Sequence, residues 1–221
     1  MEQTLTMEEV RVLGSLIEKE MATPDYYPLT LNALINACNQ KSNREPVVSF
    51  DDQTVLRAID RLRDRNFAFE VKSVDSRVPK YEHNVAKALL LTVQEVAVLD
   101  VLLLRGPQTV GELRARTGRL YPFEDMDAVE ITLKTLMERE VDPLVMQLPV
   151  QPGRKEPRYA HLLMGEPEVD AAPAREIVHR GPSLDDEVNR RVASLEEEVR
   201  ELRESVAELK AELAAFRAQF E

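Results

Sequence analysis

The sequence contains an internal repeat whose blocks recur in the same order, and this repeat constrains the fold more than any other feature. Residues 5–13, LTMEEVRVL, are matched by residues 91–99, LTVQEVAVL. Both stretches pair a threonine with a glutamate three positions later, which is the capping box of a helix N-terminus. The pairs are Thr6 with Glu9 and Thr92 with Glu95. Apolar residues follow at helical spacing, so each copy is predicted to open with a core helix.

The next blocks predict two more helices in each copy. The second helix follows a proline, Pro28 or Pro107, and in the second copy Thr109 and Glu112 form a further capping box. The third helix is indicated by apolar residues three or four positions apart that lead to an arginine. This third helix is expected over residues 55–65 and 129–139.

Strand-like runs follow the third helix of each copy, and a polar turn separates two strands each time. The expected strands are residues 67–71 and 79–83 in the first copy, and 143–148 and 157–161 in the second. Three helices followed by a hairpin is the element order of a winged helix. We therefore predict an α+β, mainly helical chain with two tandem winged-helix domains. A different repeated α+β unit is the alternative.

A heptad repeat occupies the end of the chain. From Val188 onward, apolar residues alternate four and three positions apart, which predicts a coiled coil. Valine at the a positions and leucine at the d positions favour a parallel homodimer. The predicted dimer contacts are Val192, Leu195, Val199, Leu202, Val206, Leu209 and Leu213. A single solvated helix, or a helix folded back on the domains, is the alternative.

The repeat and the heptads divide the chain into four parts. They are a first winged-helix domain over residues 1–88, a second over 89–165, a proline-containing linker over 166–183 and a coiled-coil dimerisation helix over 184–221. The net charge of −11 is unevenly spread. Residues 1–90 hold 12 basic and 14 acidic side chains, residues 91–165 hold 9 and 11, and the remainder holds 8 and 15. Both domains are close to neutral, so the composition permits a local basic face on either.

The first copy also carries a dense motif. It comprises residues 16–20 (LIEKE), 23–34 (TPDYYPLTLNAL) and 37–47 (ACNQKSNREPV). These residues resemble the signature of the YceH-like family of uncharacterised bacterial proteins. The resemblance implies paired winged-helix domains and a bacterial cytoplasmic protein, and it implies no established activity.

The third helix of the first copy is the predicted DNA-reading element. Its apolar face leaves Arg57 and Arg61 pointing outward, together with Asp60 and Asp64. The arginines favour phosphate contact, whereas the aspartates favour a self-neutralised surface. The basic residues expected to contact nucleic acid or another partner are Arg57, Arg61, Arg65, Lys72, Arg77 and Lys80. Acidic residues crowd the matching helix of the second copy, which favours a protein-binding or domain-to-domain role there.

A polar segment before that helix, residues 39–46, is the least ordinary part of the chain. Its candidate binding residues are Asn39, Gln40, Lys41, Ser42, Asn43 and Arg44. Asn, Gln and Arg have forked donors and acceptors that suit base edges, phosphates or peptide backbone. The same side chains also suit a structural role, in which they satisfy helix ends and hold a turn. The sequence leaves both interpretations open.

Patterns typical of enzymes do not occur. The three histidines, His83, His161 and His179, have no cysteine or carboxylate at metal-ligand spacing, and no P-loop or glycine-rich nucleotide motif is found. We therefore expect no catalysis, no metal and no cofactor. A single cysteine, Cys38, is predicted to be a buried small hydrophobe. This cysteine, the acidic N-terminus and the lack of a long apolar run predict a cytoplasmic protein that does not contact membrane.

Two functions are compatible with these features. The leading hypothesis is a dimeric, regulator-like protein that binds double-stranded DNA through its first domain. The alternative is a winged-helix scaffold that binds another protein without touching nucleic acid. The near-neutral charge of both domains keeps the alternatives close.

Overall fold

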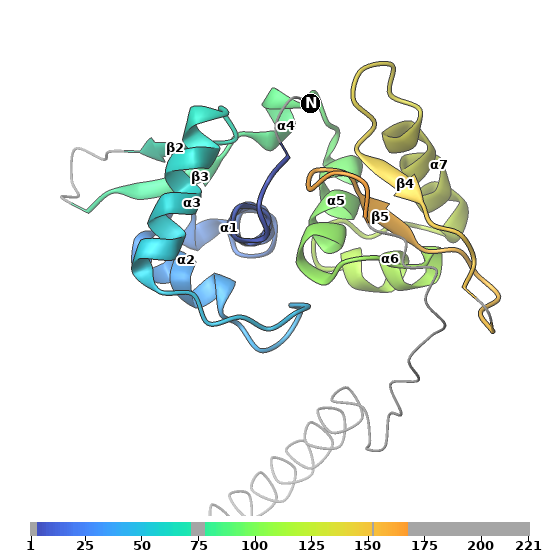
Figure 1. The fold of residues 1–221 in the computed structure, drawn as a ribbon, viewed down its shortest axis with the longest axis horizontal. Coiled ribbons are helices and arrows are strands. Elements are labelled where there is room, and N and C mark those ends of the chain that lie inside the picture. Colours follow the sequence, from blue (N-terminus) through green and yellow to red (C-terminus); the bar gives the residue numbers. More distant parts are fainter. Residues whose placement is uncertain (1–3, 72–77, 152, 168–221) are drawn as a thin grey trace, which may run out of the picture. The chain divides into compact units, whose positions relative to one another are not determined.

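The computed structural model describes residues 4–71, 78–151 and 153–167 (Figure 1). These residues belong to one compact unit that spans residues 1–170. The predicted coiled coil, nearly all of the predicted linker and the tip of the first hairpin lie outside the described residues.

Three helices begin with the capping boxes expected from the sequence. They are α1 (Met7–Ala22), α5 (Val93–Arg105) and α6 (Val110–Thr117). In each box the threonine hydroxyl accepts a hydrogen bond from the backbone N–H three residues later. The glutamate at that position accepts one from the threonine N–H. These helix starts are confirmed because both partners of a capping box are close in sequence.

The first half places its remaining elements in the expected order. After α1 and a short 3-10 helix, Pro24–Tyr26, come α2 (Leu31–Cys38), α3 (Asp52–Asp64), β2 (Ala68–Val71) and β3 (Lys80–His83). The two strands pair antiparallel, with Ala68 opposite His83. A short helix, α4 (Val85–Ala88), then leads into the second half.

A third strand in this sheet was not predicted. It is β1 (Leu29–Thr30), which pairs antiparallel with β3 and makes the strand order β1-β3-β2. Its two residues show no alternation, and Thr30 is already the N-cap of α2, so the sequence pattern indicated only the helix. The strand is defined by a partner that lies far along the chain.

The second half repeats this arrangement in smaller form. α5 and α6 are followed by α7 (Met126–Met137) and by the antiparallel strands β4 (Val145–Gln147) and β5 (Tyr159–His161). β4 is shorter than the predicted strand over residues 143–148. An antiparallel bridge from Gln108 to Tyr159 stands where β1 pairs with β3 in the first half. The described residues therefore form an α+β fold in which three helices and a hairpin occur twice.

The opening helices of the two halves pack against each other at the centre of the unit (Figure 1). Every residue from Glu9 to Glu18 in α1, and from Glu95 to Leu104 in α5, is buried. α1 is covered by α2 and α3 on its own side and by α5 on the other. A helix buried on all sides has no solvent-facing stripe. Charged residues on these helices must therefore find partners inside the protein.

Close packing between the two helices requires a glycine. A Cβ atom added at Gly14 of α1 would lie 2.8 Å from Cδ2 of Leu104 in α5, well inside van der Waals contact. The repeat aligns Gly14 with Asp100 and Glu18 with Leu104. The pair Gly14 and Leu104 therefore corresponds, in the repeat, to the pair Asp100 and Glu18. The second pair has two carboxylates where the first has a glycine and a leucine.

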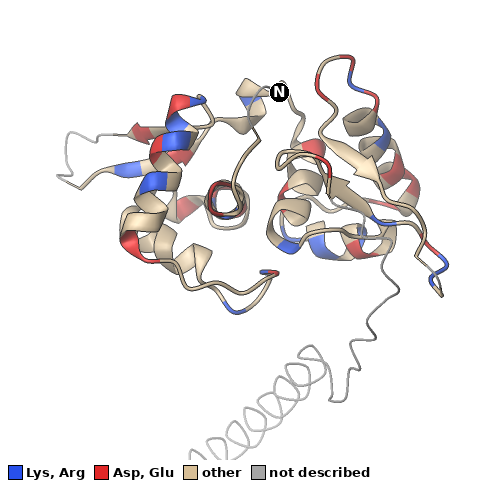
Figure 2. Ribbon diagram, viewed as in Figure 1, with Lys and Arg blue, Asp and Glu red and all other residues tan. Residues whose placement is uncertain are grey.

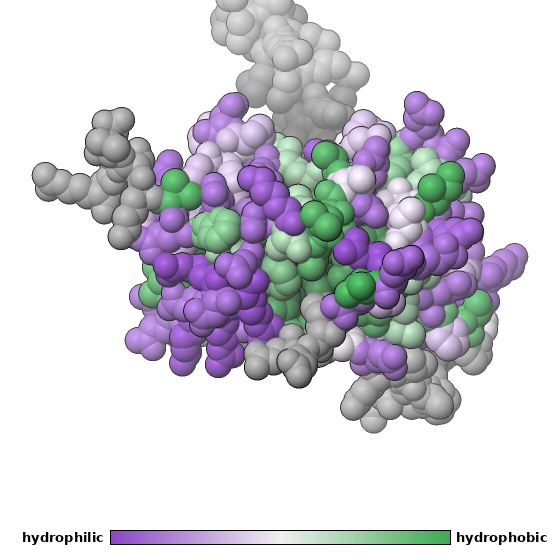
Figure 3. Space-filling view, turned by 90° about the horizontal axis from the view of Figure 1, so that it is seen from above, coloured by the Kyte–Doolittle hydropathy of each residue, from purple (hydrophilic) through white to green (hydrophobic). Residues whose placement is uncertain are grey.

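Some hydrophobic residues remain at the surface. Figure 3 shows them gathered across the middle of one face, between hydrophilic flanks. At the junction of α4 and α5, Leu90 is 84% exposed and Val93 is 58% exposed. Cys38, by contrast, is buried at the end of α2, as predicted.

Candidate functional site

The polar segment between α2 and α3 is held by its own side chains. The Asn39 amide donates to the Phe50 carbonyl at 2.9 Å and accepts from the Phe50 N–H at 2.8 Å. These two bonds join the beginning of the connection between α2 and α3 to its end. They support the structural role for Asn39, because its amide copies the hydrogen-bonding pattern of a backbone.

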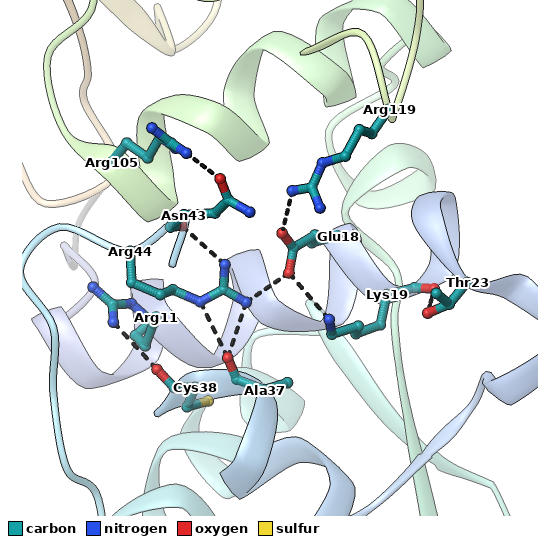
Figure 4. A network of polar contacts seen from close by, with 10 residues as sticks. All are labelled: Arg11, Glu18, Lys19, Thr23, Ala37, Cys38, Asn43, Arg44, Arg105 and Arg119. Atoms are coloured by element: carbon teal, nitrogen blue, oxygen red, sulfur yellow. Dashed lines mark hydrogen bonds and ion pairs between the residues drawn. The ribbon is translucent and has the colours of Figure 1, made fainter. Parts of the chain in front are cut away.

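Arg44 points inward and is only 6% exposed (Figure 4). Its Nε and Nη2 atoms donate to the Ala37 carbonyl at 3.1 and 2.9 Å, and Nη1 donates to the Asn43 carbonyl at 2.9 Å. Nη2 also donates to Oε2 of Glu18 at 2.6 Å. The guanidinium group is therefore committed to the interior and lies outside any exposed binding surface.

Glu18 joins the two halves of the unit. Besides Arg44, its carboxylate contacts Nη2 of Arg119 in the second half at 3.1 Å and Nζ of Lys19 at 3.6 Å. Burial alone would raise the pKa of Glu18, but the hydrogen bond and charge of Arg44, with Lys19 and Arg119, outweigh it and hold this pKa below its usual value. Glu18 is therefore charged and fully partnered inside the protein.

The polar segment also contributes to this contact between the two halves, which we call the junction. Oδ1 of Asn43 accepts a hydrogen bond from Arg105 of α5 (Figure 4), and the Glu45 N–H donates to the Leu104 carbonyl at 2.8 Å. Asn43 has a φ of 58°, a left-handed conformation that asparagine tolerates better than most residues. Asn43 and Glu45 thus connect the segment to the second half.

Accessibility varies along the segment, and Glu45 and Pro46 at its end are exposed. Lys41 and Ser42 are exposed, and Gln40 is half-buried. Of the predicted binding residues in this segment, these are the ones that can meet a partner without rearrangement.

The exposed face of α3 carries charges of both signs along its length (Figure 2). Arg57 and Arg61 are exposed one helical turn apart. Nη1 of Arg61 lies 3.8 Å from Oε1 of Glu9, yet its side chain is 61% exposed. On the same helix Arg63 pairs with Asp60 at 3.1 Å. α3 thus offers Arg57 and Arg61 as accessible arginines, beside the ion-paired Arg63, within a charge-mixed surface.

The other predicted basic residues are less prominent. Arg65 is half-buried, and its Nη1 lies 3.6 Å from Oε2 of Glu9 and donates to the Thr4 carbonyl at 3.2 Å. Lys80 is half-buried at the start of β3. The positions Lys72 and Arg77, and the seven predicted dimer contacts from Val192 to Leu213, lie outside the described residues.

The second half has a groove at the positions of α7 that correspond to Arg57 and Arg61 of α3. The groove has a volume of about 490 Å³ and lies between the start of α5, the loop after α6 and the exposed side of α7. Its lining combines apolar and polar side chains, chiefly Glu95, Tyr121, Phe123, Glu124, Ile131 and Thr135. The rings of Tyr121 and Phe123 meet edge to face with centroids 4.9 Å apart. Ile131 is 65% exposed, which is unusual for an isoleucine on a helix.

Asp100 lies in the middle of α5 and is 1% exposed. Burial, together with the neighbouring Glu18 carboxylate, raises the pKa of Asp100 well above its usual value, against the charges of Arg44, Arg119 and Lys19. A small space of about 20 Å³ adjoins it, lined also by Glu18, Asn43 and Arg105. Asp100 is therefore a component of the junction and has no access to bulk solvent.

The two described histidines have structural surroundings. Nε2 of His83 lies 2.5 Å from the Glu20 carboxylate, and its Nδ1 accepts from the Val85 N–H at 3.3 Å. Burial lowers the pKa of His161 to about 4. Among residues 4–71, 78–151 and 153–167, no group of three His, Cys, Asp or Glu side chains is placed to hold a metal ion. In the same residues no helix is both long and apolar enough to cross a membrane.

Sequence patterns named Asn43 and Arg44 among the candidate binding residues but did not mark the other residues that form the junction. Glu18, Asp100 and Arg119 were not singled out, although Asp100 interrupts an otherwise apolar run and could have been noticed as a buried acid. Arg11 was also missed, and it donates to the carbonyls of Cys38 and Pro46 at 3.3 and 2.6 Å. Their partners lie on other elements, so no local pattern marks them.

Comparison with known proteins places the chain in a family. Residues 5–154 match the family model described as "Protein of unknown function, DUF480". The chain is 56% identical to a UPF0502 protein of Geobacter metallireducens over 221 residues and 54% identical to one of Geobacter sulfurreducens over 223 residues, with both chains fully covered in each case. It is also 54% identical to a UPF0502 protein of Koribacter versatilis over 198 residues, which is 89% of each chain. The expected membership of an uncharacterised bacterial family is confirmed, whereas the YceH-like name stays a prediction. The chain belongs to the DUF480 or UPF0502 family of uncharacterised bacterial proteins.

Proposed function

We propose that this protein is a dimeric, regulator-like DNA-binding protein built from two winged-helix domains, with α3 of the first half as the helix that enters the major groove. It acts in the cytoplasm and has no catalytic role. The repeated order of three helices and a hairpin, with a third strand in the first half that pairs with β3, supports the winged-helix assignment.

The pair of exposed arginines on α3 carries this proposal. The repeat aligns Arg57 with Ile131 and Arg61 with Thr135. Only the third helix of the first half therefore presents guanidinium groups at these two outward positions. Arginine is well suited to phosphate because its planar fork donates two parallel hydrogen bonds. Lys41 in the preceding segment and Lys80 on β3 add positive charge on the same domain.

Acidic neighbours limit the strength of this contact. Asp60 and Asp64 are exposed on the same helix, and Glu9 lies close to Arg61. We therefore expect affinity to come from a few phosphate contacts and to fall steeply with salt. Pairing of two subunits through the heptads of residues 184–221 would present two α3 helices and double the number of contacts.

Protein binding without DNA contact is the second candidate. It is favoured by the commitment of Asn39, Asn43 and Arg44 to internal hydrogen bonds, which removes them from a nucleic-acid surface. It is also favoured by the groove beside α7. An experiment on DNA affinity separates the two candidates.

We would measure fluorescence anisotropy of labelled duplex DNA with the full-length protein over a range of salt concentrations. The double variant Arg57→Ala with Arg61→Ala should weaken binding and reduce the slope of log K against log salt by about two per subunit, since each phosphate contact contributes roughly 0.9. The matched double variant Ile131→Ala with Thr135→Ala should leave the slope unchanged. Absence of binding at low salt, or equal slopes in all three proteins, would refute the DNA-binding proposal.

A further inference from the structure

The first half of the molecule contains a template for what the groove of the second half can bind. The first turn of α1 contains Glu9, whose carboxylate lies 3.8 Å from Arg61 and 3.6 Å from Arg65. Glu95 has the equivalent position at the start of α5. Both glutamates also close their capping boxes, so their carboxylates are held in the same orientation.

The second half has a short side chain where the first has an arginine. Thr135 is aligned with Arg61, and its hydroxyl donates to Oε1 of Glu95 at 3.0 Å. A threonine cannot extend over the groove as arginine does. The space above Glu95 is therefore left open, and Tyr121, Phe123 and Ile131 form its apolar wall.

We propose that this groove binds a segment of a partner protein in which an arginine or lysine lies beside an apolar side chain. The apolar side chain would pack against Phe123 and Ile131. The cationic group would replace the missing arginine and lie over Glu95 and Glu124. This proposal does not depend on DNA binding, because it concerns a different half of the molecule.

The charge around the groove fits a basic segment. Glu95 and Glu124 line it, and Asp127 and Glu130 are exposed on α7 next to it. The bases nearby are Lys134 on α7 and Arg114, whose Nη2 donates to the Glu124 carbonyl at 2.8 Å. A carboxylate at the edge of an apolar site makes a stronger contact with guanidinium than one in open water, since less solvent competes. An acidic segment would meet repulsion at every one of these four carboxylates.

The occupant can be identified by selecting from a library of randomised peptides displayed on phage, with the full-length protein as bait. The most enriched peptide, made with a fluorescent label, would then be titrated with wild-type protein and with Thr135→Arg. This substitution copies Arg61 of the first half, so it should fold and fill the groove. We expect enriched peptides that share a basic residue next to an aliphatic or aromatic one. We also expect Thr135→Arg to weaken binding by about ten-fold or more, as for loss of a central anchor.

Two controls sharpen this test. Glu138→Gln, at the exposed C-cap of α7, should leave peptide affinity within about two-fold, as expected of a peripheral charge. Replacement of the basic residue of the peptide by glutamine should weaken binding as much as Thr135→Arg does.

The proposal would be overturned by no enrichment, by enriched peptides without a basic residue, or by equal affinity of wild type and Thr135→Arg. It would also be overturned if Thr135→Arg abolished self-association in sedimentation velocity, because the occupant would then be a second copy of this chain.

Discussion

Glu9 and Glu95 lie in the first turns of equivalent helices and cap them in the same way, but their surroundings differ. Arg61 and Arg65 approach Glu9, while Glu95 receives a hydrogen bond from Thr135 beneath an open groove. Both halves have the capping box, which satisfies backbone N–H groups at the start of a buried helix. The third helix differs at its outward positions, which are free of that constraint, and this difference gives each half a surface of its own.

The junction between the halves shows a second difference. α1 presents Gly14 and Glu18 to α5, and α5 presents Asp100 and Leu104 in return. On one side the contact is tight and apolar. On the other it consists of two carboxylates, of which Glu18 is held by Arg44 and Arg119. The two sides of this interface therefore use aligned positions of the repeat and differ in chemistry.

The largest expected effect is on the charged side of the junction. Arg44→Met should destabilise the protein by about 3–5 kcal/mol, because it leaves the buried Glu18 carboxylate without its main partner. Urea-induced unfolding followed by circular dichroism measures this loss. Lys41→Met, at an exposed position of the same segment, should change stability by no more than about 0.5 kcal/mol. Equal stability of the two variants would contradict the central role of the Arg44 to Glu18 pair.

The apolar side of the junction should respond to a single added methyl group. Gly14→Ala places a Cβ 2.8 Å from Leu104 Cδ2 and should cost about 1–3 kcal/mol by overpacking. Gly111→Ala provides the matched control, since nothing lies within 4 Å of an added Cβ there. That control should be neutral or stabilising by up to about 1 kcal/mol. Thermal unfolding of both variants measures these changes in stability, and equal stability of the two would contradict the close packing at Gly14.

The buried acid should make stability depend on pH. Asp100 has a pKa raised above its unfolded value, so its contribution to stability is fully present below the unfolded pKa and is lost as pH rises toward the folded one. Asp100→Asn cannot titrate. As pH rises through this window, which begins near pH 4, the free energy of unfolding of the variant should therefore increase relative to that of wild type by about 1.4 kcal/mol per pH unit. Unfolding free energies measured across pH test this, and a difference that stays constant with pH would disprove it.

The smallest effect should be shared by both halves. Thr6→Ala and Thr92→Ala each remove a helix cap and should each cost about 1 kcal/mol. Ser42→Ala, at an exposed position outside any cap, serves as the control. Denaturant titration should give similar losses for the two caps. A large loss for one and none for the other would mean that the halves differ even where their local structure is the same.

The sequence by itself determined the helix starts at Met7, Val93 and Val110 and the order of the elements. Capping boxes and apolar periodicity join residues that are close along the chain, so they can be recognised without a structure. The candidate binding residues on α3 were located in the same way, since the apolar face of a helix defines its exposed face.

Only the tertiary structure decided which polar residues remain available. Arg44 and Asn39 were candidates for binding. Glu18 holds Arg44 inside the protein, and Phe50 holds Asn39 within the connection between α2 and α3. The groove beside α7 depends on α5, α7 and the loop after α6, which meet only in the folded chain. The physical reason is the same in each case. A buried hydrogen bond or an open groove depends on what lies across the fold from a residue, and neighbours along the sequence do not reveal this.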